Sequence, residues 1–379
     1  MSKSEKDLLL LKTTVEATSS LIEQLVSLIK ASRTGSPASQ KQLNDIDAIS
    51  LAWDASSLIR AHTTKLSLLI INTPFTPTAI HTVLRELTSG PLPALATAVE
   101  VCSAASYTKI MRSELQWRVN RVLVELLSLI KMIPVEDEEL KDGSAGVGKE
   151  VTLAATGVLW QACDDVMALK ELGVAGLIIK KAGQYQETLK DALEELREWE
   201  EETSNNDEEP EGRVEVLESG DINTSNDTLV NFFDYPHHIP ANDSLQIRER
   251  LSKFLQRLKL IQHLYSAIIK RRLKTLPILP LRSDLFPRLG NVVERVDEIM
   301  SILKRLPDLT DELAIAFYEF DLKEIDRRMD DCFSSSFSAS ELSALNWKGE
   351  KDEFSTWVRF PKSFFIECAI RVSLTSTSL

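Results

Sequence analysis

The stretch that decides the fold runs from Lys149 to Glu202 and reads KEVTLAATGVLWQACDDVMALKELGVAGLIIKKAGQYQETLKDALEELREWEEE. In its second half, apolar residues recur at alternating spacings of four and three, the pattern of a helix packed along another helix. These residues are Ile178, Ala182, Tyr185, Leu189, Ala192, Leu196 and Trp199. The first half repeats the pattern with Val151, Ala155, Val158, Ala162, Val166 and Leu169. Because a glycine tolerates the left-handed turn that ends a helix, Gly173 predicts a helical hairpin.

The composition limits the kind of protein this can be. With 379 residues, of which 43% are hydrophobic, the chain can bury a large core, and its length suggests two domains. A formal net charge of -13 disfavours direct nucleic-acid binding, since phosphate contacts need a cationic surface. Cys102, Cys163, Cys332 and Cys368 lie far apart without a CxxC pair, so we expect free thiols in a reducing compartment.

The short apolar runs of the chain bear on export and on membrane insertion. The apolar run Leu8–Leu11 follows charged residues and is too short for the core of a signal peptide. The apolar stretch Leu66–Ile71 falls well short of the roughly 20 residues needed to cross a bilayer. We therefore expect a soluble intracellular protein without a membrane span.

Helical patterns also fill the sequence before Lys149. They predict helices over Ser4–Ser32, up to Asn72, from Pro77 to Gly90, over Leu92–Ala104 and over Tyr107–Ile133. Thr76 and Pro77 are typical of the first positions of a helix. The last of these helices has a wide apolar arc, so we expect it at the centre of a bundle. Its seam is Leu115, Val119, Val122, Leu126, Leu129 and Ile133, widened by Leu123, Val124, Leu127 and Ile130.

Acidic residues dominate from Glu200 to about Pro240, where Arg213 is the only opposing arginine or lysine. Such a stretch cannot bury enough apolar surface to order itself, so it predicts a flexible linker. We therefore divide the chain into an N-terminal helical bundle (1–202), an acidic linker (203–240), a C-terminal helical bundle (241–360) and a disordered tail (361–379).

The second bundle is predicted from its helix starts and stops. Asn242-Asp243-Ser244 is a good cap cluster for a helix that runs to about Thr275. A helix over Val292–Leu306 is expected to end before Pro307, and another follows over Asp308–Phe333. Ser338–Glu341 resembles a capping box that begins the last helix.

The helix that ends near Thr275 has a basic outer face, which we regard as a candidate partner-binding surface. Its candidate residues are Arg248, Lys253, Arg257, Arg271 and Arg272, within a longer set that adds Arg250, Lys259, Lys270 and Lys274. Most such residues only solvate a helix face. The alternative is that they bind an acidic partner or the chain's own acidic linker.

The chain carries one near match to a nucleotide-binding motif and none to a metal or hydrolase motif. Gly143–Glu150 reads GSAGVGKE and fits a phosphate loop except at Glu150, where the magnesium-binding hydroxyl belongs. Bundle metal sites need Glu-x-x-His pairs, but Ile59, Thr78 and Leu260 stand three residues before His62, His81 and His263. Asp164-Asp165 lacks a third acid, and His237-His238 reads as a surface pair. We expect no catalytic residue, cofactor or metal, and a nucleotide switch stays a minor alternative.

At Thr156-Gly-Val-Leu-Trp160-Gln-Ala-Cys163-Asp164-Asp165, the chain resembles the GCIP family of cyclin-D-interacting proteins. The likeness is clearest from about Ala48 to Trp199. The resemblance implies an all-helical fold similar to vinculin and α-catenin bundles, and binding to D-type cyclins, helix-loop-helix factors or signalling adaptors in cytoplasm and nucleus. It adds Trp160, Asp164 and Asp165 to the candidate partner-binding residues.

The family is also described as having a helix-loop-helix element without a DNA-reading basic region, and the hairpin around Gly173 fits that place. We therefore expect an all-α protein of two antiparallel helical bundles joined by an acidic linker. Its expected role is non-enzymatic, as a negative regulator of cell-cycle progression or transcription. The alternative is a vinculin-like cytoskeletal or adhesion bundle or adaptor, from architecture alone.

Overall fold

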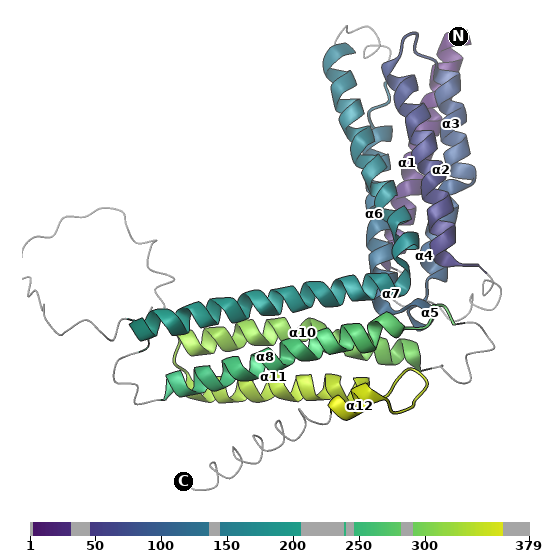
Figure 1. Cartoon of the computed structure of the whole chain (residues 1–379). Coiled ribbons are helices and arrows are strands. Elements are labelled where there is room, and N and C mark those ends of the chain that lie inside the picture. The colour runs from purple at the N-terminus through teal and green to yellow at the C-terminus, as the bar shows by residue number, and fades with distance from the viewer. Residues whose placement is uncertain are drawn as a thin grey trace, which may run out of the picture. The chain divides into compact units, whose positions relative to one another are not determined.

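The computed structural model describes residues 3–31, 46–135, 145–205, 239, 246–281 and 291–358, and these contain helices and turns but no β-strand (Figure 1). The predicted all-α class is confirmed. In chain order the elements are α1 (Lys3–Ala31), α2 (Ala48–Ile71), α3 (Pro77–Ser89), α4 (Pro91–Val101), α5 (Ala104–Tyr107), α6 (Lys109–Ile130), α7 (Ala145–Asn205), α8 (Ile247–Arg271), the 3-10 helix η3 (Leu273–Thr275), α10 (Val292–Tyr318), α11 (Leu322–Ser343) and α12 (Glu353–Trp357).

The chain divides into two compact units. The first comprises Met1–Ile178 with Pro277–Asp297, and the second comprises Ile179–Leu276 with Glu298–Leu379. The boundary that we expected at residue 202 therefore differs from the observed division, because α7 continues from the first unit into the second. Of the predicted linker, only residues 203–205 and 239 are described, and the predicted tail and the cap cluster Asn242–Ser244 lie outside the described residues.

The helix α7 is interrupted at Gly173, whose φ of 61° and ψ of 179° lie outside the helical region. Residues with a Cβ rarely adopt these angles, so the predicted break at this glycine is confirmed. The predicted pairing of the two arms is corrected. The first arm packs on α2 and α6 in the first unit, and residues after Ile178 pack on α8 and α10 in the second. An apolar stripe shows that a helix is covered, but not by which neighbour.

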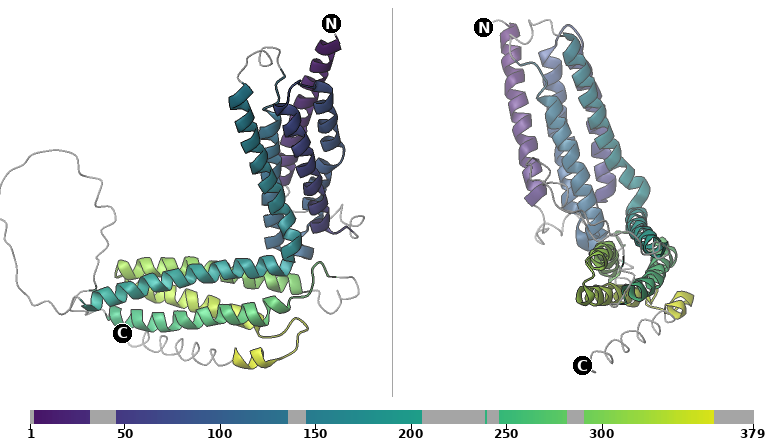
Figure 2. Two further views of the ribbon diagram at one scale, coloured as in Figure 1. Left: turned by 45° about the horizontal axis from the view of Figure 1, so that its top comes forward. Right: turned by 90° about the vertical axis from the view of Figure 1, so that its left-hand side faces the viewer.

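The core of the first unit is built from the apolar faces that the sequence predicted. Along α6, Leu115, Val119, Val122, Leu126 and Leu129 are fully buried. The helices α1, α4 and α6 contact one another, and Figure 2 shows α1 and α6 running side by side. However, Trp117 is 59% exposed and Val124 is 41% exposed. We expected α6 to be surrounded by other helices, but one of its sides faces solvent.

Two helix starts in the first unit use different chemistry. The Asp47 carboxylate caps α2 by accepting hydrogen bonds from the backbone amides of Ile49 and Ser50. It also accepts one from the hydroxyl of Tyr107 at 2.9 Å, which ties α5 to α2. Thr76 stands at the N-cap of α3 as predicted, but its hydroxyl donates to the Pro74 carbonyl instead of capping the helix.

In the second unit, the end of α7 lies alongside α8, α10 and α11 (Figures 1 and 2). The Gln186 amide nitrogen donates to the Ser266 hydroxyl of α8 at 2.7 Å. The rings of Trp199 and Tyr318 meet edge to face at 5.1 Å. Phe254 of α8 lies 5.9 Å from Phe317, ring centre to ring centre. Aromatic contacts therefore join helices that are distant in the sequence.

Two predicted helix boundaries in this unit are wrong. Pro307 lies inside α10 instead of ending a helix. Ser338–Glu341 lies inside α11, and the Ser338 hydroxyl donates to the Ser334 carbonyl at 2.9 Å. Serine can bond back to the preceding helical turn in this way, so the capping-box pattern does not require a helix start. A capping box does occur at Asp352 and Ser355, where α12 begins.

Candidate partner-binding surfaces

Trp160 and Asp164 of the first arm of α7 both contact Arg60 of α2. The Arg60 guanidinium lies 5.3 Å from the centre of the Trp160 ring and pairs with the Asp164 carboxylate at 2.9 Å. These two charged side chains are 43% and 45% exposed, so the ion pair lies at the surface. The indole nitrogen of Trp160 is buried without a hydrogen-bond partner among the described residues. The cluster therefore packs α7 on α2 and keeps part of Asp164 open to solvent.

Asp165 connects α7 to α6. Its carboxylate pairs with Arg121 at 2.8 Å and accepts a hydrogen bond from Gln161 at 2.9 Å. Its backbone carbonyl accepts a hydrogen bond from Arg118, which also pairs with Glu114 at 2.9 Å. The sequence did not indicate these arginines as partners because they lie on another helix. Their contacts give Asp165 a packing role within the first unit.

Most of the candidate basic residues of α8 are engaged within the second unit. Arg248 donates to the carbonyl of Ile239 at 3.4 Å, and Lys253 pairs with Glu249 at 2.5 Å. Arg257 places its guanidinium 4.9 Å from the ring centre of Phe333. These contacts support the interpretation that this part of the basic face mainly solvates and packs the helix.

Arg272 is corrected as a partner-binding candidate, because it is only 1% exposed. Its guanidinium binds both oxygens of Asp352, at 2.7 and 2.9 Å, and donates to the carbonyl of Ser343 at 2.7 Å. Its own carbonyl accepts a hydrogen bond from the Trp347 indole at 2.8 Å. This bidentate contact holds the pKa of Asp352 at about 2, below its ordinary range. The residue thus anchors the chain segment that ends in α12.

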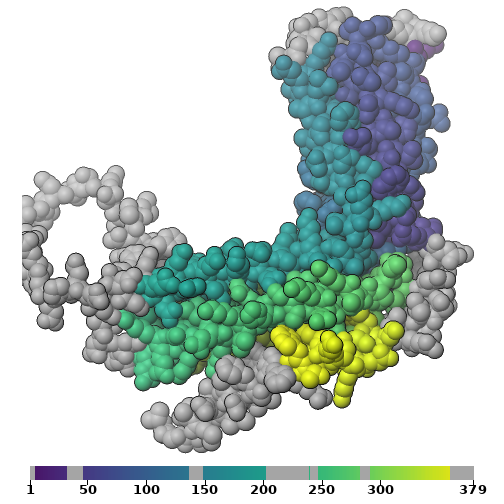
Figure 3. All heavy atoms as spheres, viewed as in Figure 1, coloured from purple at the N-terminus to yellow at the C-terminus, as the bar shows by residue number. Residues whose placement is uncertain are grey.

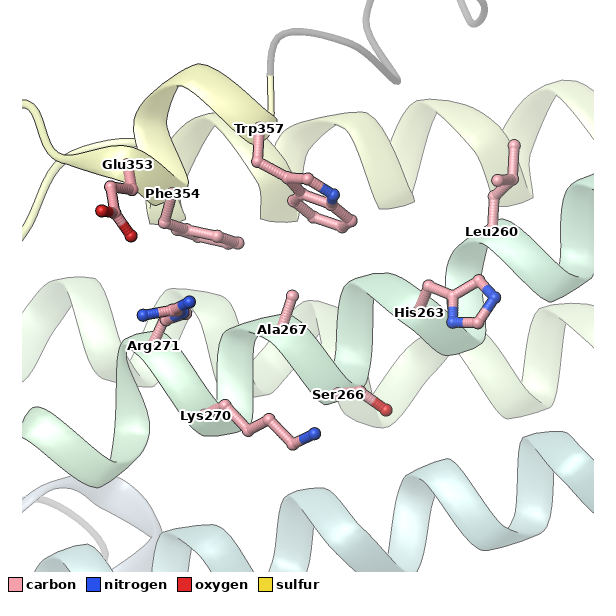
Figure 4. A pocket seen from close by; sticks show the side chains of 9 residues that line it. All are labelled: Leu260, His263, Ser266, Ala267, Lys270, Arg271, Glu353, Phe354 and Trp357. Atoms are coloured by element: carbon pink, nitrogen blue, oxygen red, sulfur yellow. The ribbon is translucent and has the colours of Figure 1, made fainter.

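Arg271 differs from its neighbour, since it is exposed and lines an open groove between α8 and α12 (Figure 4). Lys270 and His263 line the same groove from α8, and Phe354 and Trp357 line it from α12. The sequence predicted none of the α12 residues as a candidate. Two aromatic residues three positions apart in a short segment were the available signal.

The described residues hold no group of three His, Cys, Asp or Glu side chains arranged to bind a metal. Of the phosphate-loop match, Gly143 and Ser144 lie outside the described residues, whereas Lys149 and Glu150 stand in the first turns of α7. Within the described part of the chain, no helix is both long enough and apolar enough to cross a membrane.

A known family model covers most of the first unit and the second arm of α7. It includes the helices α2 to α6 and the cluster in which Trp160 and Asp164 pack on Arg60. Residues 52–202 match the model described as "Grap2 and cyclin-D-interacting, N-terminal". This segment is similar to the N-terminal part of the Grap2 and cyclin-D-interacting family. The resemblance predicted from the sequence is confirmed over the family segment, residues 52–202.

A relative from yeast is similar to a large part of the chain. An uncharacterized protein of Schizosaccharomyces pombe is 24% identical over 256 residues, which cover 67% of this chain and 70% of the relative. No solved structure matches the chain.

Proposed function

We propose that this chain is a non-enzymatic protein-interaction protein that restrains cell-cycle progression or transcription by binding cyclin-type or helix-loop-helix partners. The observation that carries the proposal is the match of residues 52–202 to a family that is named for its interaction with cyclin D. The helical fold is in keeping with it, because helical bundles bind other proteins through exposed side chains of their helices.

The finer architecture forms part of the proposal. Two antiparallel bundles of the vinculin or α-catenin kind would give partners two separate helical surfaces, with the acidic segment 203–240 belonging to the second unit. The family's helix-loop-helix element corresponds to the arms around Gly173, and Lys149 is the only basic residue just before Glu150, so a DNA-reading role is not proposed. The proposed location is the cytoplasm and the nucleus.

A direct binding experiment tests the function. The purified full chain, immobilised on a biosensor, is exposed to a D-type cyclin and, separately, to a helix-loop-helix protein. Saturable binding of either supports the proposal. Absence of binding by both, together with cosedimentation with actin filaments, would favour the cytoskeletal alternative instead.

Surface variants connect that experiment with the structure. Asp164→Ala removes a half-exposed carboxylate of the family segment, and Asp54→Ala serves as a control on α2 outside the Arg60 cluster. Weaker cyclin binding by the first variant alone would place the partner on the α2 and α7 face. Equal binding by both variants would assign Asp164 to packing.

A further inference from the structure

The face of α8 that lies beside α12 forms an open groove of about 710 Å³ (Figure 4). Leu260 and Ala267 contribute apolar side chains from α8, and Phe354 and Trp357 contribute aromatic rings from α12. The two rings stack at 5.6 Å, and Trp357 remains 39% exposed. In the space-filling view of Figure 3, α12 in yellow lies against α8 in green on the face turned to the viewer. An apolar surface that is open to solvent is a feature of binding sites.

The α12 wall of the groove is fixed by interactions behind it. The buried Arg272 guanidinium binds Asp352, the N-cap residue of α12, and lies 4.6 Å from the ring centre of Phe354. The hydroxyl of Ser355 donates to the carbonyl of Ala344, the residue that directly follows α11. Because this wall is built from contacts within the chain, a partner would meet a preformed surface and lose little free energy in ordering it.

The charge at the groove is opposite to that of the whole chain. Lys270 and Arg271 line it and are exposed, and Lys274 is exposed one turn further on. Glu353 is the acidic residue among the lining side chains. The whole chain has a formal net charge of -13. A basic rim attracts acidic groups and repels basic ones, so this groove favours an acidic partner over a neutral or a basic one.

We propose that this groove binds an acidic amphipathic helix of a partner protein. Between Leu260 and Arg271 the axis of α8 advances by about 16 Å, which corresponds to about three turns of a bound helix. Apolar residues of the partner, spaced by three or four positions, contact Ala267 and Trp357, and its acidic residues face Lys270 and Arg271. This inference rests on the proposed role in protein binding and adds the surface and the chemistry of the partner.

The test uses the full chain and a designed probe. The probe is a fluorescein-labelled, helix-stapled peptide of about 15 residues, with leucine at positions i, i+3, i+4 and i+7 and glutamate at most others. A second peptide has glutamine in place of each glutamate, and a third has lysine. Fluorescence anisotropy is expected to show saturable binding of the acidic peptide, with affinity falling from the acidic to the glutamine to the lysine peptide.

Two double variants provide a matched comparison. Lys270→Glu with Arg271→Glu reverses the basic rim, and Lys304→Glu with Arg305→Glu reverses the same exposed dipeptide on α10, outside the groove. The first is expected to weaken binding of the acidic peptide by at least about tenfold, and the second by no more than about twofold. Trp357→Ala is expected to weaken it by about tenfold, whereas Trp117→Ala, which removes another exposed tryptophan, leaves it unchanged.

The proposal is overturned if the acidic peptide does not bind, or if the two double variants weaken binding equally. It is also overturned if deletion of the chain's own residues 207–235 is required before any peptide binds, since the groove would then serve the chain itself. The outcome for the proposed function is separate. If the peptide binds but neither a cyclin nor a helix-loop-helix protein does, the groove proposal stands and the proposed partners are rejected. If a cyclin binds and the Lys270→Glu, Arg271→Glu variant binds it equally well, the proposed function stands and the groove is not the cyclin site.

Discussion

The hydroxyl of Tyr265 on α8 donates a hydrogen bond to the carbonyl of Leu303 on α10. In a regular helix this carbonyl would accept the backbone N–H of residue 307, but that residue is Pro307, which has no N–H. Tyr265 is fully buried, and burial raises the pKa of its hydroxyl, which therefore stays protonated as a donor. A side chain from the neighbouring helix thus supplies the hydrogen bond that the proline removes.

This relationship predicts non-additive effects of two substitutions. Tyr265→Phe is expected to lower the free energy of unfolding by about 1–3 kcal/mol, because the Leu303 carbonyl loses its donor in a buried site. In a Pro307→Ala background, the same substitution should cost about 1 kcal/mol less, since the alanine N–H can reach that carbonyl. Urea unfolding of the four proteins measures the difference. Equal costs in both backgrounds would disprove the compensation.

Asp352 should stabilise the protein in a pH-dependent way. Its pKa in the folded protein is about 2, below the ordinary value of 3.8, because Arg272 binds its ionised form. The contribution is therefore complete above about pH 4 and is lost as the pH falls toward 2. Asp352→Asn is expected to lower the unfolding free energy by about 1–3 kcal/mol at pH 6, with the difference shrinking toward pH 2.

The comparison must be made between the two proteins at each pH. Glu324, on α11, also has its pKa lowered to about 2, by hydrogen bonds from Arg327 and Arg328, so the pH profile of a single protein mixes both groups. Chemical unfolding at pH 2, 3, 4 and 6 measures the difference. A gap between the two proteins that widens at low pH would contradict the assignment.

Asp164 and Trp160 should differ sharply in their effect on folding. Asp164 pairs with Arg60 at the surface, so Asp164→Ala is expected to change the unfolding free energy by less than about 1 kcal/mol. Trp160→Ala removes a large half-buried ring next to Arg60 and is expected to cost about 2–4 kcal/mol. Thermal and urea unfolding check both values. A large loss from Asp164→Ala would show that this ion pair is structural.

The buried cysteines should resist modification in the folded protein. Burial raises the pKa of the Cys102, Cys163 and Cys332 thiols to about 12, so little reactive thiolate is present at neutral pH. In a Cys368→Ser background, a thiol-specific disulfide reagent at pH 8 should react at least about a thousandfold more slowly than in denaturant. Fast reaction of one of the three without unfolding would show that its site opens.

The sequence predicted the features of the fold that depend on which side of a helix is buried. The seam from Leu115 to Leu129 lies in the core, since three-four spacing records directly which side of a helix is covered. The break at Gly173 was also predictable, because it depends on the conformational freedom of one residue.

The features that the sequence did not predict depend on contacts between residues that lie far apart in the chain. Pro307 reads as a helix end unless Tyr265, on another helix, is known to lie beside Leu303. Arg272 reads as a surface charge, since its carboxylate partner is 80 positions later. The groove escaped prediction for the same reason, because its two walls come from α8 and the short α12.

The course of α7 has a practical consequence for the search for partners. A fragment trimmed to the family segment, residues 52–202, would omit α1, whose Leu11 and Ile22 are fully buried. It would also carry Leu189 and Leu196 without the helices that cover them. In an interaction screen, such a fragment would expose these leucines to solvent and bind unrelated proteins nonspecifically. Interaction screens should therefore use the full-length chain.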